Sequence, residues 1–384
     1  MSVSAIDGVH EAAQRAVRGR QLVICVGSGG VGKTTTAATI GLWGAMQGKK
    51  VLVLTIDPAR RLANSLGLSE FGNAERQIDL SKLGEVQGEL WAMMLDTQTT
   101  FDELIRKMAP DTATAQRILS NPIYVTMSDT FAGSQEYMAA EKLHDVVTGG
   151  KYDLVVLDTP PVKNALDFFE APGRLSRFFD KRVIDWFLHP PKKRGLFSSV
   201  VSGTSTVIWK LLGYVFGADF LEDLAEFLQL FKDMYAGFQE RHERVLEIFH
   251  SDATRFITVC APTEPSVEVA GFFAEELRRR SYPRAGVVVN QVHLCSDTPL
   301  EAAALLHEEA QALSEDLESR TAASLVARLG AAHGRLRQQA ATERALVEKV
   351  RSFADGFIVQ VPRLENEVHD LHGLSQVAHH LFHG

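Results

Sequence analysis

Short apolar runs recur along the chain and alternate with longer amphipathic stretches. Runs rich in valine, leucine and isoleucine, with few interleaved polar residues, are typical of strands buried on both faces of a parallel sheet. Six such strands are predicted, at residues 21–26, 51–56, 153–158, 255–260, 285–290 and 357–361. Helical patterns lie between most of them, so the sequence predicts an α/β fold with a mostly parallel, doubly wound sheet.

The predicted strands are spread over the whole chain, which favours one domain spanning residues 1–384 over two consecutive domains. Two stretches without strand patterns are predicted to be helical insertions, at residues 173–250 and 297–352. The second opens with Asp297 and Pro299, which suit a helix cap and a first-turn proline. Within it we expect two helices that meet near Gly330 or Gly334.

Apolar side chains in the first insertion recur at spacings of four and three residues, the pattern of one helix face. One interpretation is a helix packed into the core. The other is a wall of a groove for a hydrophobic client, to which methionine and phenylalanine are suited. The pattern alone leaves both interpretations open. The stripe consists of Phe220, Leu224, Phe227, Phe231, Met234 and Phe238.

Residues 196–220 are apolar and rich in glycine, serine and threonine. The stretch is as long as a membrane span, but the charge of Lys210 and the many small polar residues argue against one. We interpret it as a lid or as a segment that rests on a membrane surface. The first insertion is therefore predicted to be a client-binding or lid subdomain.

Residues 27–35 fit the pattern GxxxxGK[ST] and lie between a predicted strand and a predicted helix, as a P-loop requires. Glycines let backbone N–H groups point at phosphate oxygens, and the helix N-terminus adds a favourable dipole. Lys33 would reach the β- and γ-phosphates of a nucleotide, and the Thr34 hydroxyl would bind Mg²⁺. The predicted nucleotide contacts are Gly29, Gly30, Val31, Gly32, Lys33, Thr34 and Thr35.

Two carboxylates follow buried strands on the same predicted edge of the sheet. Asp158 ends the run LVVLD, where a Walker-B carboxylate is expected, and would hold Mg²⁺ together with Thr34. Asp57 follows VLVLTI and could orient the attacking water, because phosphoryl transfer depends on positioning. The alternatives are a strand-end cap for Asp158 and a structural turn before Pro58 for Asp57.

Composition narrows the classes of function. The chain has 40 basic and 48 acidic residues, a net charge of -8, which argues against a nucleic-acid binder. The three cysteines, Cys25, Cys260 and Cys295, form no CxxC pair, so neither a disulfide framework nor a cysteine zinc site is expected. Without an apolar signal segment near the start, the chain is predicted to be cytoplasmic.

Five histidines fall in the last 16 residues of the sequence: His369, His372, His379, His380 and His383. Two of them, four residues apart, would share a helix face and could bind a metal. No carboxylate or thiol pair accompanies them, so we interpret this region as a solvated tail.

The assembled motifs resemble those of the ArsA-like family, which includes arsenite-pump ATPases and ATPases that target tail-anchored membrane proteins. GGVGKTT (29–35), TIDPARRLANSLG (55–67) and LVVLDTPP (154–161) resemble its P-loop, switch I and switch II. The segments at 132–143 and 164–175 are most similar to a bacterial branch known only as ArsA-related. The resemblance implies a P-loop NTPase that hydrolyses ATP with Mg²⁺.

Individual roles follow from the same resemblance. Asp57 becomes the residue that positions water, Asp158 holds Mg²⁺ through water, and Asn290 reads the adenine base. Pro362 and Arg363 belong to a late loop that packs against the base. The family also implies a dimer, formed either by two copies of this chain or with a paralogous ATPase subunit.

The sequence departs from the family pattern at three places. The second P-loop residue is usually a lysine that reaches the partner's phosphates, but here it is Ser28. A paralogous partner that carries the lysine could supply that charge instead, or Lys163 could do so. The third alternative, which we favour, is that hydrolysis is slow. No CxxC is present for a zinc clasp between subunits. The separate cysteines also make a three-thiol arsenite site improbable.

Three functions remain open at this point. The first is an ATPase whose nucleotide-driven dimer rearrangement controls the binding or targeting of a hydrophobic, membrane-protein-like client. The alternative is a subunit that energises a membrane anion transporter. A positioning ATPase of the ParA or MinD type is disfavoured, because the chain lacks an evident terminal membrane helix and a basic DNA-binding face.

Overall fold

The computed structural model describes residues 3–56, 61–66, 73–130, 134–160, 217–232, 234–295 and 319–383. Asp57, Lys163 and the apolar segment up to residue 216 therefore lie outside the described residues. The structure therefore does not test the predictions made for these residues.

An eight-stranded sheet forms the centre of the molecule, in the order β3-β4-β2-β5-β1-β6-β7-β8. All neighbours pair in parallel except β3 and β4, which are antiparallel. The six predicted strands and the mostly parallel α/β fold are confirmed, whereas β3 and β4 were not predicted. The strands are β1 (Leu22–Gly27), β2 (Lys50–Thr55), β3 (Arg76–Gln77), β4 (Glu89–Met94), β5 (Leu154–Asp158), β6 (Thr254–Cys260), β7 (Arg284–Val292) and β8 (Phe357–Pro362).

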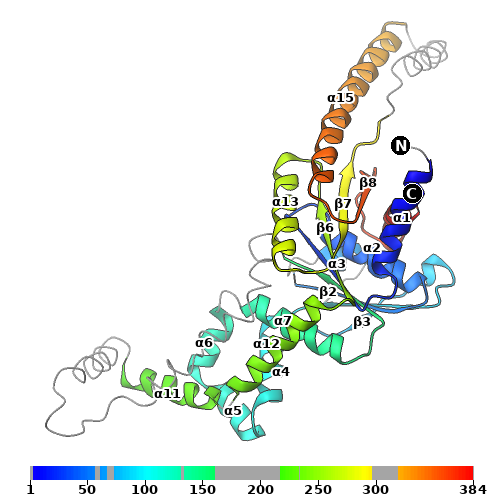
Figure 1. Cartoon of the computed structure of the whole chain (residues 1–384). Helices are drawn as coiled ribbons and strands as arrows, with labels where there is room; N and C mark the ends of the chain where they lie inside the picture. Colours follow the sequence, from blue (N-terminus) through cyan, green and yellow to red (C-terminus); the bar gives the residue numbers. More distant parts are fainter. Residues whose placement is uncertain are drawn as a thin grey trace, which may run out of the picture.

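Helices cover both faces of this sheet (Figure 1). On one face, α1 (Val3–Val17), α2 (Lys33–Met46) and α16 (Leu371–Phe382) pack against side chains such as Val23 and Val53. The alternate residues, such as Ile24 and Leu52, point into the core of the other face. That face is covered by α13 (Glu264–Arg279), α15 (Ser319–Arg351) and a group of shorter helices. Two short elements, α3 (Arg61–Ser65) and η1 (Ser81–Leu83), complete the connections.

The group of shorter helices forms a layer that extends away from the sheet (Figure 1). Part of it comes from the predicted insertion at 173–250 and part from the chain before β5. Its members are α4 (Thr97–Met108), α5 (Thr112–Ser120), α6 (Pro122–Thr130), α7 (Ser134–Thr148), α11 (Ala218–Lys232) and α12 (Tyr235–His250). Among the described residues, no helix is long and apolar enough to cross a membrane.

The predicted apolar stripe runs over two helices: α11 ends at Lys232 and α12 begins at Tyr235, with Met234 as its N-cap. Phe227, Phe231, Met234 and Phe238 are buried in the core of the helical layer. The rings of Phe231 and Phe238 stack with centroids 5.6 Å apart. Phe220, at the start of the stripe, is exposed. The core interpretation therefore describes the second half of the stripe. Leu224 is partly buried against the same core, and Phe220 faces solvent.

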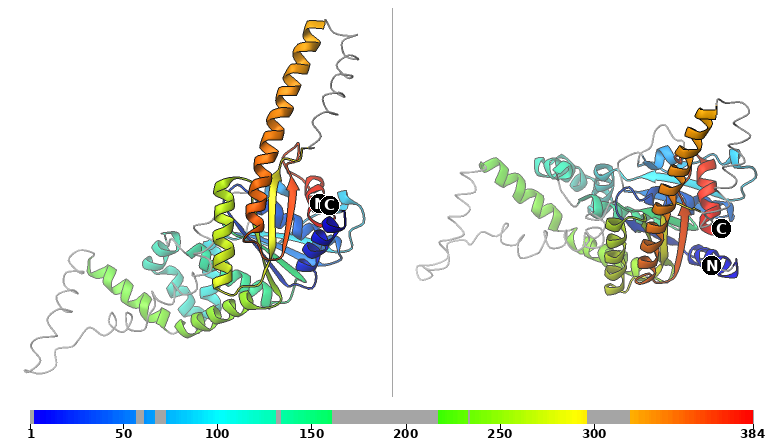
Figure 2. Two further views of the ribbon diagram at one scale, coloured as in Figure 1. Left: turned by 45° about the horizontal axis from the view of Figure 1, so that its top comes forward. Right: turned by 90° about the horizontal axis from the view of Figure 1, so that it is seen from above.

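The long helix α15 corrects the prediction for residues 297–352. It runs unbroken through Gly330 and Gly334, where two helices were expected to meet. With 33 residues it is about 50 Å long, and its N-terminal half projects away from the sheet (Figure 2). Its C-terminal part contacts the core, through Val347 and Val350 beside β7.

The chain end is also more ordered than the predicted solvated tail. Residues 371–382 form α16, whose apolar face is buried against α2. The rings of Trp43 and Phe382 stack with centroids 4.2 Å apart. His379 and His383 remain exposed on the outer face, and no group of three potential metal ligands is found among the described residues.

Candidate nucleotide-binding site

The P-loop connects β1 to α2 at the carboxyl edge of the sheet. Gly27 ends β1 with its Cα against the backbone of β6, where a Cβ atom would lie 2.1 Å from the Val259 carbonyl oxygen. Gly32 precedes α2 with φ 87°, in the left-handed region. A helix that begins directly at Lys33 presents its first N–H groups to the space in front of the loop. This is the geometry of an anion site.

Lys33 is held against the loop that it follows. Its Nζ donates a hydrogen bond of 2.8 Å to the Ser28 carbonyl oxygen, and only 7% of the residue is exposed. The ammonium group is therefore fixed beside the glycine turn rather than solvated. A fixed cation at this position can neutralise phosphate charge without first losing side-chain freedom.

Asp158 joins the P-loop helix to the neighbouring strands. Its Oδ2 accepts hydrogen bonds from the Thr34 hydroxyl at 2.7 Å and from the Thr55 hydroxyl at 3.0 Å. All three side chains are buried, at the carboxyl ends of β5 and β2 and at the start of α2. Hydroxyl and carboxylate oxygens are the ligands that Mg²⁺ prefers, so this cluster fits the predicted metal site. Thr55 was missed, because a threonine inside an apolar run gives no motif.

A cavity of about 510 Å³ lies in front of the P-loop and is lined by Gly32, Lys33 and Thr34 on one side. The cavity is also lined by Asn290, at the end of β7, and by the loop after β8 with Pro362 and Arg363. Its volume is in the range of small-molecule sites. The structure thus brings together the predicted phosphate residues and the predicted base residues, which lie more than 250 positions apart in the sequence.

Asn290 contacts the P-loop directly. Its Nδ2 donates to the Val31 carbonyl oxygen at 2.9 Å, and a Cβ atom on Gly32 would lie 2.2 Å from the same nitrogen. The two β-strand ends are also tied together, since the Arg363 N–H donates to the Val292 carbonyl oxygen at 2.9 Å. The base side and the phosphate side of the cavity are therefore one connected structure.

The structure shows the surroundings of the residues at which the sequence departs from the family pattern. The Ser28 hydroxyl lies 3.2 Å from that of Ser266, at the start of α13 in the same chain.

Burial raises the pKa of the Cys260 thiol to about 12. Burial and the charge of Asp158 also raise the pKa of Cys25. Both cysteines belong to separate core clusters, so neither is placed as a thiolate ligand.

The fold and this site define a P-loop nucleoside triphosphatase. The family model described as anion-transporting ATPase, ArsA, matches residues 20–318. The chain belongs to this family of ATPases, which confirms the family resemblance and implies the use of ATP.

Relatives agree with this assignment at low identity. An ATPase ASNA1 homolog of Plasmodium yoelii yoelii is 26% identical over 280 residues, covering 72% of this chain and 64% of that protein. An ATPase get3 of Aspergillus terreus is 25% identical over 267 residues, covering 69% of this chain and 71% of that protein. An ATPase get3 of Schizosaccharomyces japonicus is 25% identical over 275 residues, covering 71% of this chain and 74% of that protein. The chain thus spans less than two thirds of the Plasmodium relative.

Proposed function

We propose that this chain is a Mg²⁺-dependent ATPase whose nucleotide state controls the binding of a hydrophobic, membrane-protein-like client through rearrangement of a dimer. The cluster of Lys33, Thr34 and Asp158 beneath a cavity of nucleotide size carries the first part of the proposal. Its buried carboxylate and hydroxyl are groups that would hold Mg²⁺, and the ion would supply positive charge to a bound triphosphate.

In this proposal each residue has a defined task. The N–H groups of Gly30 to Thr35 would surround the phosphates, and the Lys33 ammonium, held beside the glycine turn, would neutralise charge on the β- and γ-phosphates. Thr34 and Asp158 would hold Mg²⁺, and that ion would supply further charge neutralisation. Asn290, Pro362 and Arg363 hold the base. Asp57, outside the described residues, is the proposed group that orients the attacking water.

Support for the client role comes from the helical layer. Phe220 on α11 and Val125 on α6 are both exposed, and these two helices pack against each other. The apolar sequence 196–216 leads directly into α11. A contiguous exposed apolar patch marks a surface for a hydrophobic partner, and these two side chains are the part of the proposed surface that lies within the described residues.

The ATPase part is tested with the purified chain. Wild type should hydrolyse ATP with Mg²⁺ and lose the activity when EDTA is added. Lys33→Ala should lose turnover by at least about a hundredfold, because a preorganised cation at the transferred phosphate is worth that much or more. Turnover of Lys33→Ala within a few-fold of wild type would remove this residue from the mechanism.

The client part is tested with a variant that should bind but not hydrolyse ATP. Asp57→Asn, loaded with ATP and Mg²⁺, should keep a synthetic transmembrane helix in solution, whereas Lys33→Ala should not. A helix that precipitates equally with both variants would contradict client binding. Stable association with a membrane transporter instead of a free helix would favour the alternative, an energising subunit for anion transport.

A further inference from the structure

The strand end that carries Asn290 has an irregular backbone. Gln291, the next residue, has φ 62°, and the pairing of β7 with β8 shifts between Val289 and Val292. A non-glycine residue in the left-handed region costs about 1–2 kcal/mol and persists only where its surroundings hold it. The turn that points Asn290 at the P-loop therefore needs an anchor.

Glu343 of α15 supplies two contacts to the residue that follows β7. Its Oε2 accepts the backbone N–H of His293 at 2.7 Å, and its Oε1 lies 2.7 Å from the His293 ring Nδ1. A carboxylate can only accept, so this ring nitrogen carries the hydrogen. Gln339, one turn earlier on α15, donates to the same Oε1 at 3.0 Å.

This carboxylate is buried, with 5% of the residue exposed. Burying a charged carboxylate is costly unless hydrogen bonds compensate, and here the partners lie at the end of the strand that carries Asn290. The loop after β8 is fastened to the same place, since Arg363 donates its N–H to Val292. Both base-facing segments of the cavity are thus connected to Glu343 within three residues of chain.

We infer that Glu343 is a positioning residue for base recognition. By clamping His293 it holds the Asn290–Gln291 turn in the orientation that places Asn290 between the P-loop and the base side of the cavity. The inference rests on the proposed nucleotide site and adds to it a residue on a different element, about 50 positions beyond the strand. Its effect should fall mainly on the base side, because within the part of the chain that the structure describes the hydrogen bonds of Glu343 go to His293 and Gln339 rather than to the P-loop.

The test compares three ligands by calorimetry on the full chain: ATP, GTP and inorganic tripolyphosphate, which lacks a base. Glu343→Ala should weaken ATP binding by about tenfold, the size of one lost hydrogen bond to a charged group. It should also reduce the ratio of ATP to GTP affinity, whereas the affinity for tripolyphosphate should fall much less than that for ATP. Glu343→Gln, which still accepts the His293 N–H, should restore most of the ATP affinity.

Glu348→Ala is the matched control, since Glu348 lies on the same helix and is exposed, with Arg351 as its partner. It should change none of the three affinities. If the alanine variant does not fold, the same three affinities are measured with Glu343→Asp. This variant keeps the charge, but its shorter side chain places the oxygens farther from His293. An unchanged ratio of ATP to GTP affinity in these variants, or equal losses for all three ligands, would overturn the inference. A wild-type chain that binds no ligand would instead refute the nucleotide site itself.

Discussion

Gly32 is the residue at which the two halves of the nucleotide site touch. Its positive φ disfavours any side chain, and the Asn290 amide occupies the space that a Cβ atom would need. A single missing methyl group thus allows the P-loop and the base-reading strand to approach. The motif predicted a glycine here for the phosphates, whereas the contact with Asn290 is a second reason that only the structure shows.

We expect Gly32→Ala to lower the free energy of unfolding by about 1–3 kcal/mol, since alanine is strained at this φ and collides with Asn290. ATP affinity should fall as well, because Asn290 must move. Gly330→Ala is the control: it lies in the exposed part of α15 with nothing within 4 Å of the new Cβ atom, and should stabilise by about 0.5–1 kcal/mol. Denaturant unfolding and calorimetry measure both effects. Equal behaviour of the two variants would contradict the steric argument.

Ser28 leaves the site with one cation fewer than the family pattern provides. A positive charge supplied to the transferred phosphate from a partner can be worth several orders of magnitude in rate. If slow turnover results from that missing charge, Ser28→Lys should raise single-turnover hydrolysis at least about tenfold. Ser266→Ala, which removes only the hydroxyl beside Ser28, is the control and should leave the rate unchanged. A rate unaffected by Ser28→Lys would show that the isolated protein does not depend on this charge.

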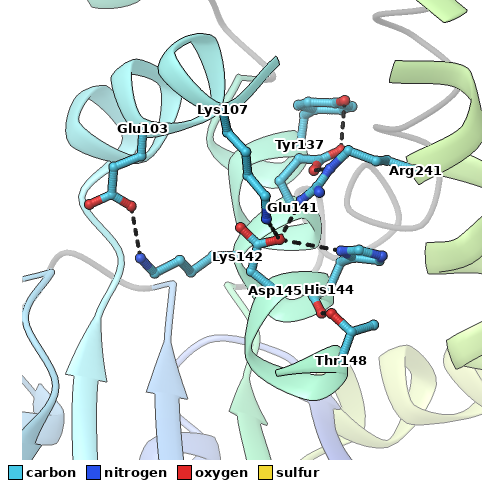
Figure 3. A network of polar contacts seen from close by, with 9 residues as sticks. All are labelled: Glu103, Lys107, Tyr137, Glu141, Lys142, His144, Asp145, Thr148 and Arg241. Carbon is cyan, nitrogen blue, oxygen red and sulfur yellow. Dashed lines mark hydrogen bonds and ion pairs between the residues drawn. The ribbon is translucent and has the colours of Figure 1, made fainter. Parts of the chain in front are cut away.

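At the scale of elements, an ionic network that is buried at Glu141 and exposed at Lys107 joins α12 to α7 and α4 (Figure 3). Arg241 of α12 forms ion pairs with Glu141 and Asp145 of α7, the latter at 2.6 Å. Lys107 of α4 also reaches Asp145, at 2.8 Å. Although burial acts in the opposite direction, hydrogen bonds from His144, Lys107 and Arg241 lower the pKa of Asp145. Its contribution to stability is therefore complete above the unfolded pKa of about 4 and is lost as the pH falls towards the folded value.

Arg241→Ala should destabilise the fold by about 3–5 kcal/mol, because it leaves Glu141 buried without its cation. Only 2% of Glu141 is exposed. Arg244→Ala provides the comparison on the same helix, since its pair with Glu240 is exposed and should be worth less than about 1 kcal/mol. Urea unfolding at pH 7 measures both. If the two variants were equally stable, the network would not hold the helical layer together.

The stripe on α11 and α12 gives a second prediction for this layer. Phe231→Asp should unfold the layer or cost several kcal/mol, because an unpaired carboxylate would replace a fully buried ring. Phe220→Asp should change stability by less than about 0.5 kcal/mol, since 38% of Phe220 is exposed. Circular dichroism on thermal unfolding separates the two. A well-folded Phe231→Asp variant that lost only client binding would return the second half of the stripe to the groove interpretation.

The elements predicted correctly from the sequence are those with a strong local pattern. Central strands buried on both faces are continuous apolar runs, whereas β4 begins with a glutamate and a partly exposed tryptophan near the sheet edge and was missed. The break expected near Gly330 was wrong because a glycine costs only about 1 kcal/mol in a helix, which the surrounding alanine, leucine and arginine residues offset. The contacts of Glu343 with His293 and of Asn290 with Val31 depend on tertiary packing, so no sequence spacing indicates them.

At the scale of the whole molecule, two structures of different kind extend from the sheet. The helical layer extends from one end of the sheet, and the exposed half of α15 projects from the other (Figures 1 and 2). The nucleotide site is connected to α15 through Glu343 and to the strand edge through Asp158. The contact with His293 therefore joins this site to a helix that continues without a break to Ser319.

The dimer predicted for this family should form without zinc. A structural zinc site uses four ligands, and a clasp across a two-fold axis would need two from each subunit. The chain has one cysteine near the end of β7, Cys295, and the other two are buried in the core. We expect the mass measured by light scattering in the presence of ATP and Mg²⁺ to be that of a dimer. After removal of zinc by a chelator that spares Mg²⁺, the mass should not change, and Cys295→Ser should behave like wild type. A monomer produced by the chelator would reveal a metal site, with the exposed His379 and His383 as the first residues to replace.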